Sequence, residues 1–378
     1  MQLVKNHEKT ANYIFLAAVA IHLLVMCVEC SSFSVPYRGR LLQAAFLLCC
    51  VKIVMTYYEQ WEWLLMFLMA ILGGAVYACC GEKYIIYVMV LIMAARGSDM
   101  RTVLKMAFGM SLVALLVIAI LSLCGIGGVP FVTEDFGRGS VETRYSLGFS
   151  HANNLHGMVW YIMSLAILMW KDRLNRYWYL GMTVLNVLLY ILTLSRAGVI
   201  ACQLMIIAGL VYRYLNKVIF EAWWIYILGG VALAAIVILT LVSVKTDCFS
   251  GYGPVLSKLD SLLTGRLNLA YQSAYIGDWH LFSPGGSHKY PIDNGFAYLP
   301  AFYGYGTAIV FVIYNAFLIW KGAVRRDGIF FALVMTGIFY TFMESSFMLN
   351  DAYLMNNPVF IVTMLLLGEN YGTEKHQA

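Results

Sequence analysis

The sequence predicts an all-α polytopic membrane protein with about twelve transmembrane helices, and three observations lead to this fold class. Hydrophobic residues make up 61% of the 378 residues and charged residues only 12%, with a mean hydropathy of +0.75. A water-soluble protein normally carries about twice that charged fraction. The apolar runs have the length of spanning helices and not that of the roughly ten-residue strands of an outer-membrane barrel. Finally, the basic residues lysine and arginine are concentrated in every second loop along the chain.

Each apolar run predicts a helix, because a segment inside lipid must satisfy its own backbone donors and acceptors. We expect spans at 11–28, 41–57, 62–80, 84–95, 102–124, 152–170, 177–194, 197–213, 222–244, 293–320, 328–346 and 353–369. No internal repeat is visible. Residues 1–378 are therefore expected to form a single membrane domain with two elaborated loops, at 125–151 and 245–292.

The basic residues set the expected orientation, since lysine and arginine in short loops mark the cytoplasmic side. With the N-terminus inside, the cytoplasmic segments contain Lys5, Lys9, Arg96, Arg101, Lys171, Arg173, Arg176, Arg213, Lys217, Lys321, Arg325 and Arg326. Both termini are then cytoplasmic. The outer side receives the loops 125–151 and 245–292, the turn 195–198 and the segment 347–352. No small-residue cleavage site follows the first run, which favours a retained span over a signal peptide.

Several function classes are not indicated. The sequence has no Walker loop, GxGxxG element, DxD pair or zinc-ligand spacing, so we expect neither a nucleotide nor a catalytic metal, and no cofactor. The net charge of +5 follows from the basic cytoplasmic loops and does not indicate a nucleic-acid partner. The nine cysteines lie mostly in or beside apolar runs, where cysteine is usually a small buried hydrophobe. Cys27 and Cys30 have redox spacing without a second such pair.

The first outer loop ends in a polar stretch directly before an apolar run. It carries Arg144, His151, Asn153 and His156, and Gly157 follows. A guanidinium, imidazoles and the free N–H groups of a helix start would together suit an anionic ligand. The alternative is that Ser150 or Asn153 simply caps the helix while His151 lies at the level of the lipid headgroups.

Arg196 lies inside a long apolar region. The sequence from 177 to 211 is nearly all apolar and too long for one span at 1.5 Å per residue, so the chain is expected to turn near Ser195. An arginine at the membrane edge needs water, a partner or a ligand, which makes Arg196 a functional hypothesis. The alternative is that its side chain extends to lipid phosphate.

The large outer loop contains an apolar stripe at helical spacing over 255–267, which predicts a helix that lies on the membrane or caps the bundle. Arg266 lies within it, and Gly277 follows after ten intervening residues. The loop closes with Asp293 and Asn294 before a glycine- and aromatic-rich helix start. A helix cap is the simplest role for Asp293.

Together these residues resemble the O-antigen polymerase and ligase superfamily, and most closely the Wzy-type polysaccharide polymerases. His151-Ala-Asn153 with Gly157 resembles that family's His-Pro-Asn stretch before a glycine, and Leu194-Ser-Arg-Ala-Gly198 resembles its Ser-Arg-(Ala/Gly)-Gly turn. Arg266 and Gly277 are similar to its RX10G pattern. Asp293-Asn294 with Gly304 is similar to the ligases' His-Asn-x9-Gly stretch. The four motifs occur in the family's order, within 144–306.

Two departures from the pattern bear on the chemistry. Ala152 replaces the usual proline, and one extra residue separates Asn153 from Gly157. Asp293 stands where the ligases have histidine, which brings the sequence nearer to the polymerases and weakens any mechanism that needs histidine there.

The resemblance implies a GT-C-like bundle and a glycosyltransferase of the bacterial cytoplasmic membrane. Such an enzyme joins undecaprenyl-diphosphate-linked oligosaccharide repeats into a surface polysaccharide on the outer face, alongside a flippase and a chain-length regulator as partners. The diphosphate already activates the sugar, so arginines can neutralise the developing charge in place of a metal.

The resemblance also implies roles for individual residues. Arg196, Arg266 and Arg144 would bind the diphosphate, since arginine donates bidentately and stays charged. Asp293 or His151 would orient or deprotonate the acceptor hydroxyl. Asn153, Asn294 and Tyr298 would contact acceptor or sugar. The further aromatic residues of the loop, which could stack on sugars or form an interfacial belt, are Tyr252, Tyr271, Tyr275, Trp279 and Tyr290.

Three other functions stay open on the sequence. A ligase would transfer a finished glycan to a different acceptor. A flippase for lipid-linked oligosaccharides would carry ionisable residues facing a cavity at the membrane midplane, for which Lys52 and His22 are the chief choices. A purely structural membrane protein would give no reason for outer arginines at the family's spacing.

Overall fold

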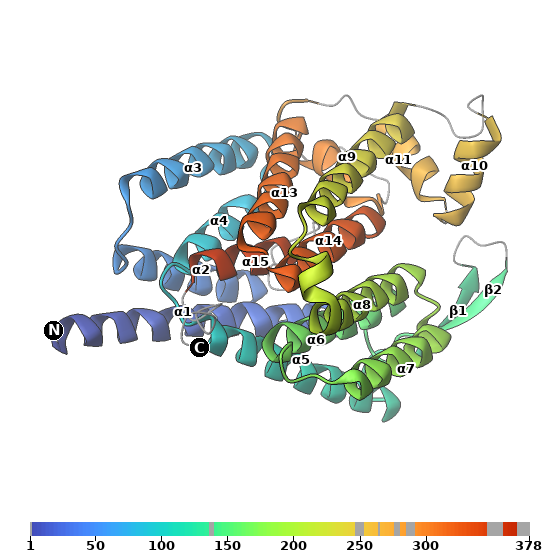
Figure 1. Cartoon of the computed structure of the whole chain (residues 1–378), viewed down its shortest axis with the longest axis horizontal. Coiled ribbons are helices and arrows are strands. Elements are labelled where there is room, and N and C mark those ends of the chain that lie inside the picture. The colour runs from blue at the N-terminus through green and yellow to red at the C-terminus, as the bar shows by residue number, and fades with distance from the viewer. Residues whose placement is uncertain are drawn as a thin grey trace.

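The computed structural model is mostly helical, with helices packed around a buried centre and a small β-hairpin at one end (Figure 1). It describes residues 2–135, 140–245, 253–263, 265–275, 280–284, 292–345 and 358–368. The predicted helical fold class is confirmed, with the addition of the hairpin.

The first five helices are α1 (Gln2–Glu29), α2 (Arg38–Val54), α3 (Gln60–Cys80), α4 (Tyr84–Ala94) and α5 (Met100–Leu123). Local capping explains several of their starts. Glu59 and Glu62 form a reciprocal capping box at α3, and the Asp99 carboxylate accepts from the Arg101 N–H at α5. α1 packs along α2 and α5, while α3 packs mainly on α4 and leaves most of its side chains exposed.

The loop between α5 and α6 forms an antiparallel hairpin of β1 (Phe131–Asp135) and β2 (Val141–Tyr145). Its register pairs Val132 with Arg144 and Glu134 with Glu142. The expectation of a purely helical chain missed this element. Five-residue strands give too short an alternation to be recognised beside long apolar runs.

The central helices are α6 (Ala152–Trp170), α7 (Arg176–Thr193), α8 (Arg196–Ile219) and α9 (Trp223–Lys245). The predicted break near Ser195 is confirmed. Leu194 adopts a left-handed conformation with φ of 50°, and the Ser195 hydroxyl caps α8 by accepting from the Gly198 N–H at 3.3 Å. α7 and α8 therefore pack as an antiparallel pair joined by a tight turn.

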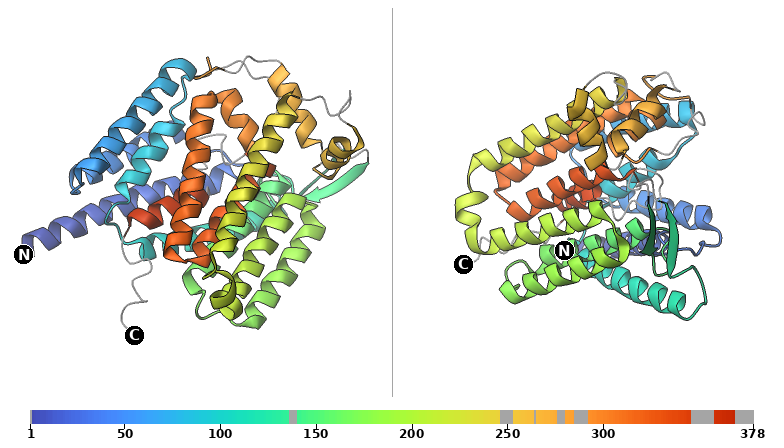
Figure 2. Two further views of the ribbon diagram at one scale, coloured as in Figure 1. Left: turned by 45° about the horizontal axis from the view of Figure 1, so that its top comes forward. Right: turned by 90° about the vertical axis from the view of Figure 1, so that its right-hand side faces the viewer.

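The C-terminal helices are α10 (Gly253–Leu262), α11 (Arg266–Tyr275), α12 (Gly295–Phe302), α13 (Tyr305–Arg325), α14 (Gly328–Met343) and α15 (Pro358–Leu367). The predicted stripe over 255–267 is divided between α10 and α11, and α11 packs on α9. Leu267 is fully buried, so this part of the loop caps the bundle. The hairpin lies at the same end of the molecule as α10 and α11, at the right of Figure 1 and of the left view in Figure 2.

The expectation of one span over 293–320 is wrong, because the segment is two helices, α12 and α13. Gly304 breaks them with φ of 102°, and a Cβ there would collide with the backbone of Leu281 and Phe282. The N–H groups of Tyr305 and Gly306 donate to the carbonyls of His280 and Leu281, both at 3.0 Å. Residues 280–284 of the large loop thus occupy the break.

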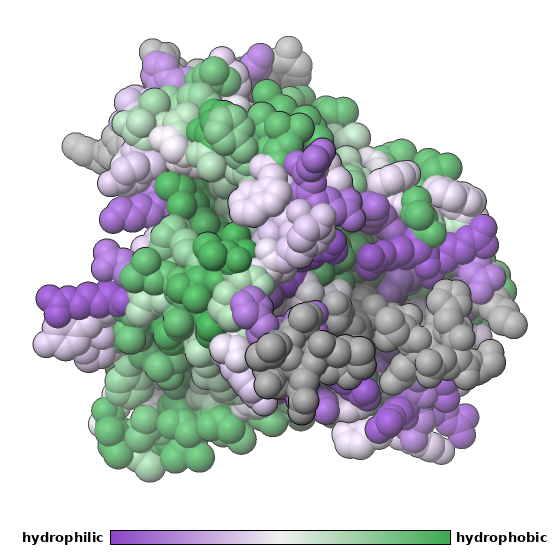
Figure 3. Space-filling view, turned by 90° about the vertical axis from the view of Figure 1, so that its left-hand side faces the viewer, coloured by the Kyte–Doolittle hydropathy of each residue, from purple (hydrophilic) through white to green (hydrophobic). Residues whose placement is uncertain are grey.

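α6 and α14 are almost entirely buried and form the centre of the bundle, whereas many other helices expose apolar faces. Within the described part of the chain, six helices are long and apolar enough to cross a membrane: His7–Glu29, Gln60–Cys80, Met100–Leu123, Arg196–Asn216, Trp223–Lys245 and Tyr305–Arg325. Apolar side chains cover broad areas of the surface seen from the left of Figure 1 (Figure 3). The chain is a multi-pass membrane protein by these features.

Candidate functional site

Arg266 is the centre of a polar cluster at the end of the molecule that carries the hairpin. Its Nη2 donates to Glu344 Oε1 at 2.8 Å, and its Nε lies 3.8 Å from Asp293 Oδ2. Asn153 Nδ2 donates to the same Glu344 oxygen at 2.8 Å. We call these four residues the Arg266 cluster. It joins α11, α14, α6 and the start of α12, which are far apart in the sequence.

The backbone around Arg266 is held in place by its own contacts. Asp260 at the end of α10 accepts from the N–H groups of Leu267 and Asn268, at 2.8 and 3.2 Å, and so caps α11. The guanidinium then donates to two backbone carbonyls, from Nε to Met343 at 2.6 Å and from Nη1 to Leu263 at 3.2 Å. These bonds fix the direction of the guanidinium and connect α11 to the end of α14.

Glu344 follows the last residue of α14 and is buried, with 12% of its side chain exposed. Burial raises the pKa of this carboxyl to about 7, and the nearby Asp293 carboxylate adds to that effect, while Arg266 and Arg144 act against it. Desolvation therefore outweighs the ion pair with Arg266. A carboxyl with this pKa can give up and take back a proton near neutral pH.

His151 and Arg144 lie next to the Arg266 cluster. His151 caps α6, with its Nδ1 accepting from the Asn153 N–H at 3.2 Å, so the predicted cap by Ser150 or Asn153 is wrong. Arg144 on β2 is buried and donates to Glu142 Oε2 from Nη2 at 2.8 Å. Partial burial and the Arg144 guanidinium lower the pKa of His151, and the Asp293 carboxylate raises it. These charges act on one another, so the predicted residues Arg144, His151 and Asp293 lie near one another.

Two further predicted residues, Asn294 and Tyr298, make contacts that stabilise the fold. Asn294, and not Asp293, caps α12 by accepting from the N–H groups of Phe296 and Ala297, and it donates to Thr240 Oγ1 at 3.3 Å. Tyr298 is buried and stacks on Phe302 with ring centres 5.1 Å apart. Neither offers an open face to a sugar in this structure. Asp293 keeps 42% of its side chain exposed and is available for a role other than capping.

Arg196 is the first residue of α8 and is exposed. Among the described residues its side chain makes no hydrogen bond or ion pair. β2 contacts α7, whose last turn leads directly to Arg196, so this arginine lies at the hairpin end of the bundle. No contact joins it to the Arg266 cluster within the described part of the chain.

A second polar group holds the turn that carries Arg196. Buried His156 is 3.0 Å from Thr193 Oγ1 through Nδ1 and 3.0 Å from Asn186 Oδ1 through Nε2. Asn186 Nδ2 donates to the Val199 carbonyl at 3.0 Å and to Gln203 Oε1 at 3.2 Å. We call His156, Asn186, Thr193 and Gln203 the His156 network. Gly198 permits it, because a Cβ there would meet the imidazole 2.5 Å away.

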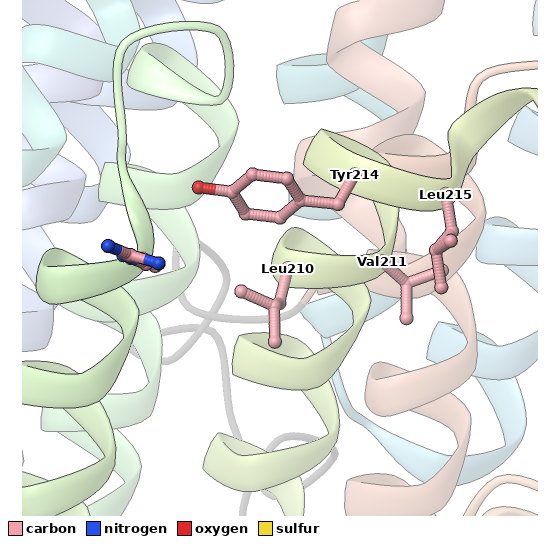
Figure 4. A pocket seen from close by; sticks show the side chains of 5 residues that line it. Leu210, Val211, Tyr214 and Leu215 are labelled. Atoms are coloured by element: carbon pink, nitrogen blue, oxygen red, sulfur yellow. The ribbon is translucent and has the colours of Figure 1, made fainter.

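A surface pocket between α7 and α8 lies away from both polar groups. Leu210, Val211, Tyr214 and Leu215 of α8 line it together with Arg176, the first residue of α7 (Figure 4). Its lining is apolar and it adjoins a kink at Leu215. Thr193 ends α7 about 27 Å from Arg176 at 1.5 Å per residue. The pocket is therefore separate from the candidate site.

Sequence reasoning missed Glu344, which accepts hydrogen bonds from two members of the cluster. A signal was present, because Glu344 is the one acidic residue in the predicted span 328–346, and an ionisable residue in such a span is a functional hypothesis. Several predicted residues lie outside the described part of the chain: Gly277 of the RX10G pattern, Tyr252, Trp279, Tyr290 and the side chain of Tyr275.

Comparisons with known proteins give no match, whether to a family model, to a curated protein or to a solved structure.

Proposed function

We propose that this protein is a metal-independent glycosyltransferase that polymerises undecaprenyl-diphosphate-linked oligosaccharides on the outer face of the bacterial cytoplasmic membrane. One observation carries the proposal. Arg266, Arg144, His151, Asp293 and Glu344 converge at one end of the helical bundle, although they come from four separate parts of the sequence. Arg266, His151 and Asp293 belong to motifs that resemble those of the O-antigen polymerase and ligase superfamily, and Arg144 precedes the first of these motifs.

The charges of this site suit a reaction with a diphosphate leaving group. Arg266 and Arg144 are buried or nearly so, and a guanidinium in such surroundings interacts with an anion more strongly than one in water. Arg196 is exposed and contributes a third positive charge at the same end of the bundle. Each of the two buried arginines already pairs with a carboxylate, so an incoming diphosphate would share Arg144 with Glu142 and Arg266 with Glu344.

The orientation is part of the proposal and follows from the basic loops, with the N-terminus inside and the hairpin outside. Val141 on the hairpin and Asp172 after α6 are exposed and lie on opposite sides under this arrangement. The exposed Cys79 and Cys124, together with Cys248 of the predicted outer loop 245–292, would first be replaced by alanine. A membrane-impermeant maleimide added to intact cells should then label V141C and spare D172C. Labelling of D172C alone would reverse the orientation and place the site inside.

The activity itself is tested with purified protein and one substrate. Incubation with a lipid-linked oligosaccharide and no other component should produce a ladder of longer glycans, each step adding one repeat. Substrate that crosses a liposome bilayer without elongation would favour a flippase, and transfer that requires a second lipid acceptor would favour a ligase. Lys52, near the end of α2, gives the flippase little support, because its Nζ already donates to Thr56 Oγ1 and to the Arg96 carbonyl.

A further inference from the structure

We propose that Glu344 is the catalytic base that removes the proton from the acceptor hydroxyl. This inference rests on the proposed function and assigns the proton transfer to a residue that none of the sequence motifs contains. Three features carry it: the different surroundings of the two Glu344 oxygens, the contacts of Glu344 with Arg266 and with Asn153 at the start of α6, and the surroundings of the two competing residues.

The two oxygens of Glu344 have different surroundings. Oε1 accepts from both Asn153 Nδ2 and Arg266 Nη2, each at 2.8 Å, so the carboxylate is held at one corner. No hydrogen bond reaches Oε2 from the described residues, and 12% of the side chain is exposed. One oxygen therefore orients the group while the other can accept a proton from a hydroxyl that enters the site.

The competing residues are less suited to the same task. His151 Nδ1 already accepts from the Asn153 N–H, so the proton of the neutral ring lies on Nε2, and neither nitrogen offers a lone pair to substrate. Asp293 is 3.8 Å from Arg266 and 42% exposed, and no short hydrogen bond from the described residues orients its carboxylate. The burial that raises the pKa of Glu344 to about 7 makes its carboxylate a suitable proton acceptor near neutral pH.

The step balances within the proposed reaction. Glu344 Oε2 takes the proton of the acceptor hydroxyl as that oxygen forms a bond to the anomeric carbon. The bond from the anomeric carbon to the diphosphate oxygen breaks, and its electron pair leaves with undecaprenyl diphosphate. Arg266 stabilises the negative charge that develops there. The protonated Glu344 then returns its proton to solvent or to the departing diphosphate.

Glu344→Gln is the direct test, because the amide oxygen can still accept from Asn153 and Arg266 while the group can no longer take a proton. We expect kcat to fall by roughly a hundredfold or more, the usual size of a general-base contribution. Glu62→Gln is the matched control. Glu62 is also buried and ion-paired to an arginine, with Arg96 Nε 3.1 Å from its Oε1, but it lies at the start of α3, far from the site in the chain. Its variant should keep kcat within about twofold.

The pH profile separates a base from a structural residue. The carboxylate is the active form, so wild-type kcat/KM should fall as the pH drops through about 7. Glu344→Gln should lose this acidic limb. Glu344→Asp should keep it at a lower rate, which gives a second test if the glutamine variant does not fold.

The inference and the proposed function fail in different ways. If the wild-type protein makes no ladder from lipid-linked oligosaccharide, the proposed function is wrong and the inference falls with it. If the wild type polymerises and Glu344→Gln retains more than about a tenth of its kcat with an unchanged acidic limb, the function stands and Glu344 is not the base.

Discussion

The Arg266 cluster and the His156 network begin one helical turn apart on α6, at Asn153 and His156, yet they differ in charge and exposure. The His156 network is buried and consists of neutral groups, and its hydrogen bonds join α6, α7 and α8. The Arg266 cluster sets two carboxylates against one guanidinium and keeps contact with solvent through Asp293 and part of Glu344. The same helix start therefore supports two kinds of polar group.

The difference indicates that the His156 network and the Arg266 cluster have different roles. A buried network whose members are all paired fixes helices relative to one another, and it is costly to disturb. A cluster that keeps contact with solvent and contains a carboxyl of pKa about 7 is suited to moving a proton. We therefore expect substitutions in the His156 network to lower stability, and substitutions in the Arg266 cluster to lower turnover.

The largest effect is expected from Arg266→Ala. It removes the partner of buried Glu344, and breaking a buried ion pair typically costs about 3–5 kcal/mol, so the protein should unfold at a clearly lower temperature and show no activity. Adding Glu344→Gln should recover much of the lost stability, because no unpaired charge then stays buried, but it should recover no activity. Thermal unfolding in detergent and the glycan ladder measure the two effects. Recovery of activity in the double variant would contradict a direct role for both residues.

Asn186→Ala should lower stability and leave turnover nearly unchanged. It removes the Asn186 amide that pairs with His156 Nε2 and leaves this ring nitrogen unpaired in the core, at a cost of about 1–3 kcal/mol. The unfolding temperature should fall, while the folded fraction keeps kcat within about threefold at low temperature. A hundredfold loss of kcat with unchanged stability would make the His156 network part of the active site.

Arg196→Ala should leave stability unchanged, because among the described residues this side chain is exposed and makes no pair. If Arg196 binds the diphosphate, kcat/KM should fall by at least roughly tenfold, and Arg196→Lys should restore only part of the loss because lysine lacks the bidentate fork. Arg213→Ala is the matched control, since Arg213 is an exposed arginine near the other end of α8. Equal effects of the two alanine variants would remove Arg196 from the site.

Asp293→Asn should have the smallest effect in the cluster. Asn294 caps α12, so the change costs little stability, and with Glu344 as the base turnover should fall by less than about fivefold. His151→Ala should likewise retain measurable turnover. A hundredfold loss in Asp293→Asn would return the role of base to Asp293, and such a loss in His151→Ala would assign it to His151.

The sequence predicted the helices well where apolar runs and capping residues coincide. The expected span 152–170 matches α6, and the break at Ser195 follows from the length of the apolar region. The break at Gly304 could not be predicted, because it depends on residues 280–284 packing into it from the large loop. The hairpin was missed because its strands are only five residues long.

The candidate site was predicted in part. Motifs identified Arg266, Asp293, His151 and Asn153, and the polar stretch before α6 identified Arg144. The structure brings these residues together. They did not reveal Glu344, which contacts Arg266 although the two are 78 residues apart in the sequence. Glu344 lies near the end of an apolar run whose pattern is that of an ordinary apolar helix. Motif spacing also suggested contact roles for Asn294 and Tyr298, whose side chains instead cap α12 and pack in the core. Long-range partners and burial are set by packing, which local patterns do not contain.

The most direct measurement is the glycan ladder made in EDTA from lipid-linked oligosaccharide by the wild type, Arg266→Lys and Arg213→Lys, each purified and shown to be folded. If the Arg266 cluster stabilises the leaving diphosphate without a metal, the wild type and Arg213→Lys should give the same ladder. Arg266→Lys should then be at least roughly tenfold slower. A full ladder from Arg266→Lys, or no ladder from the wild type until a divalent cation is added, would contradict this account.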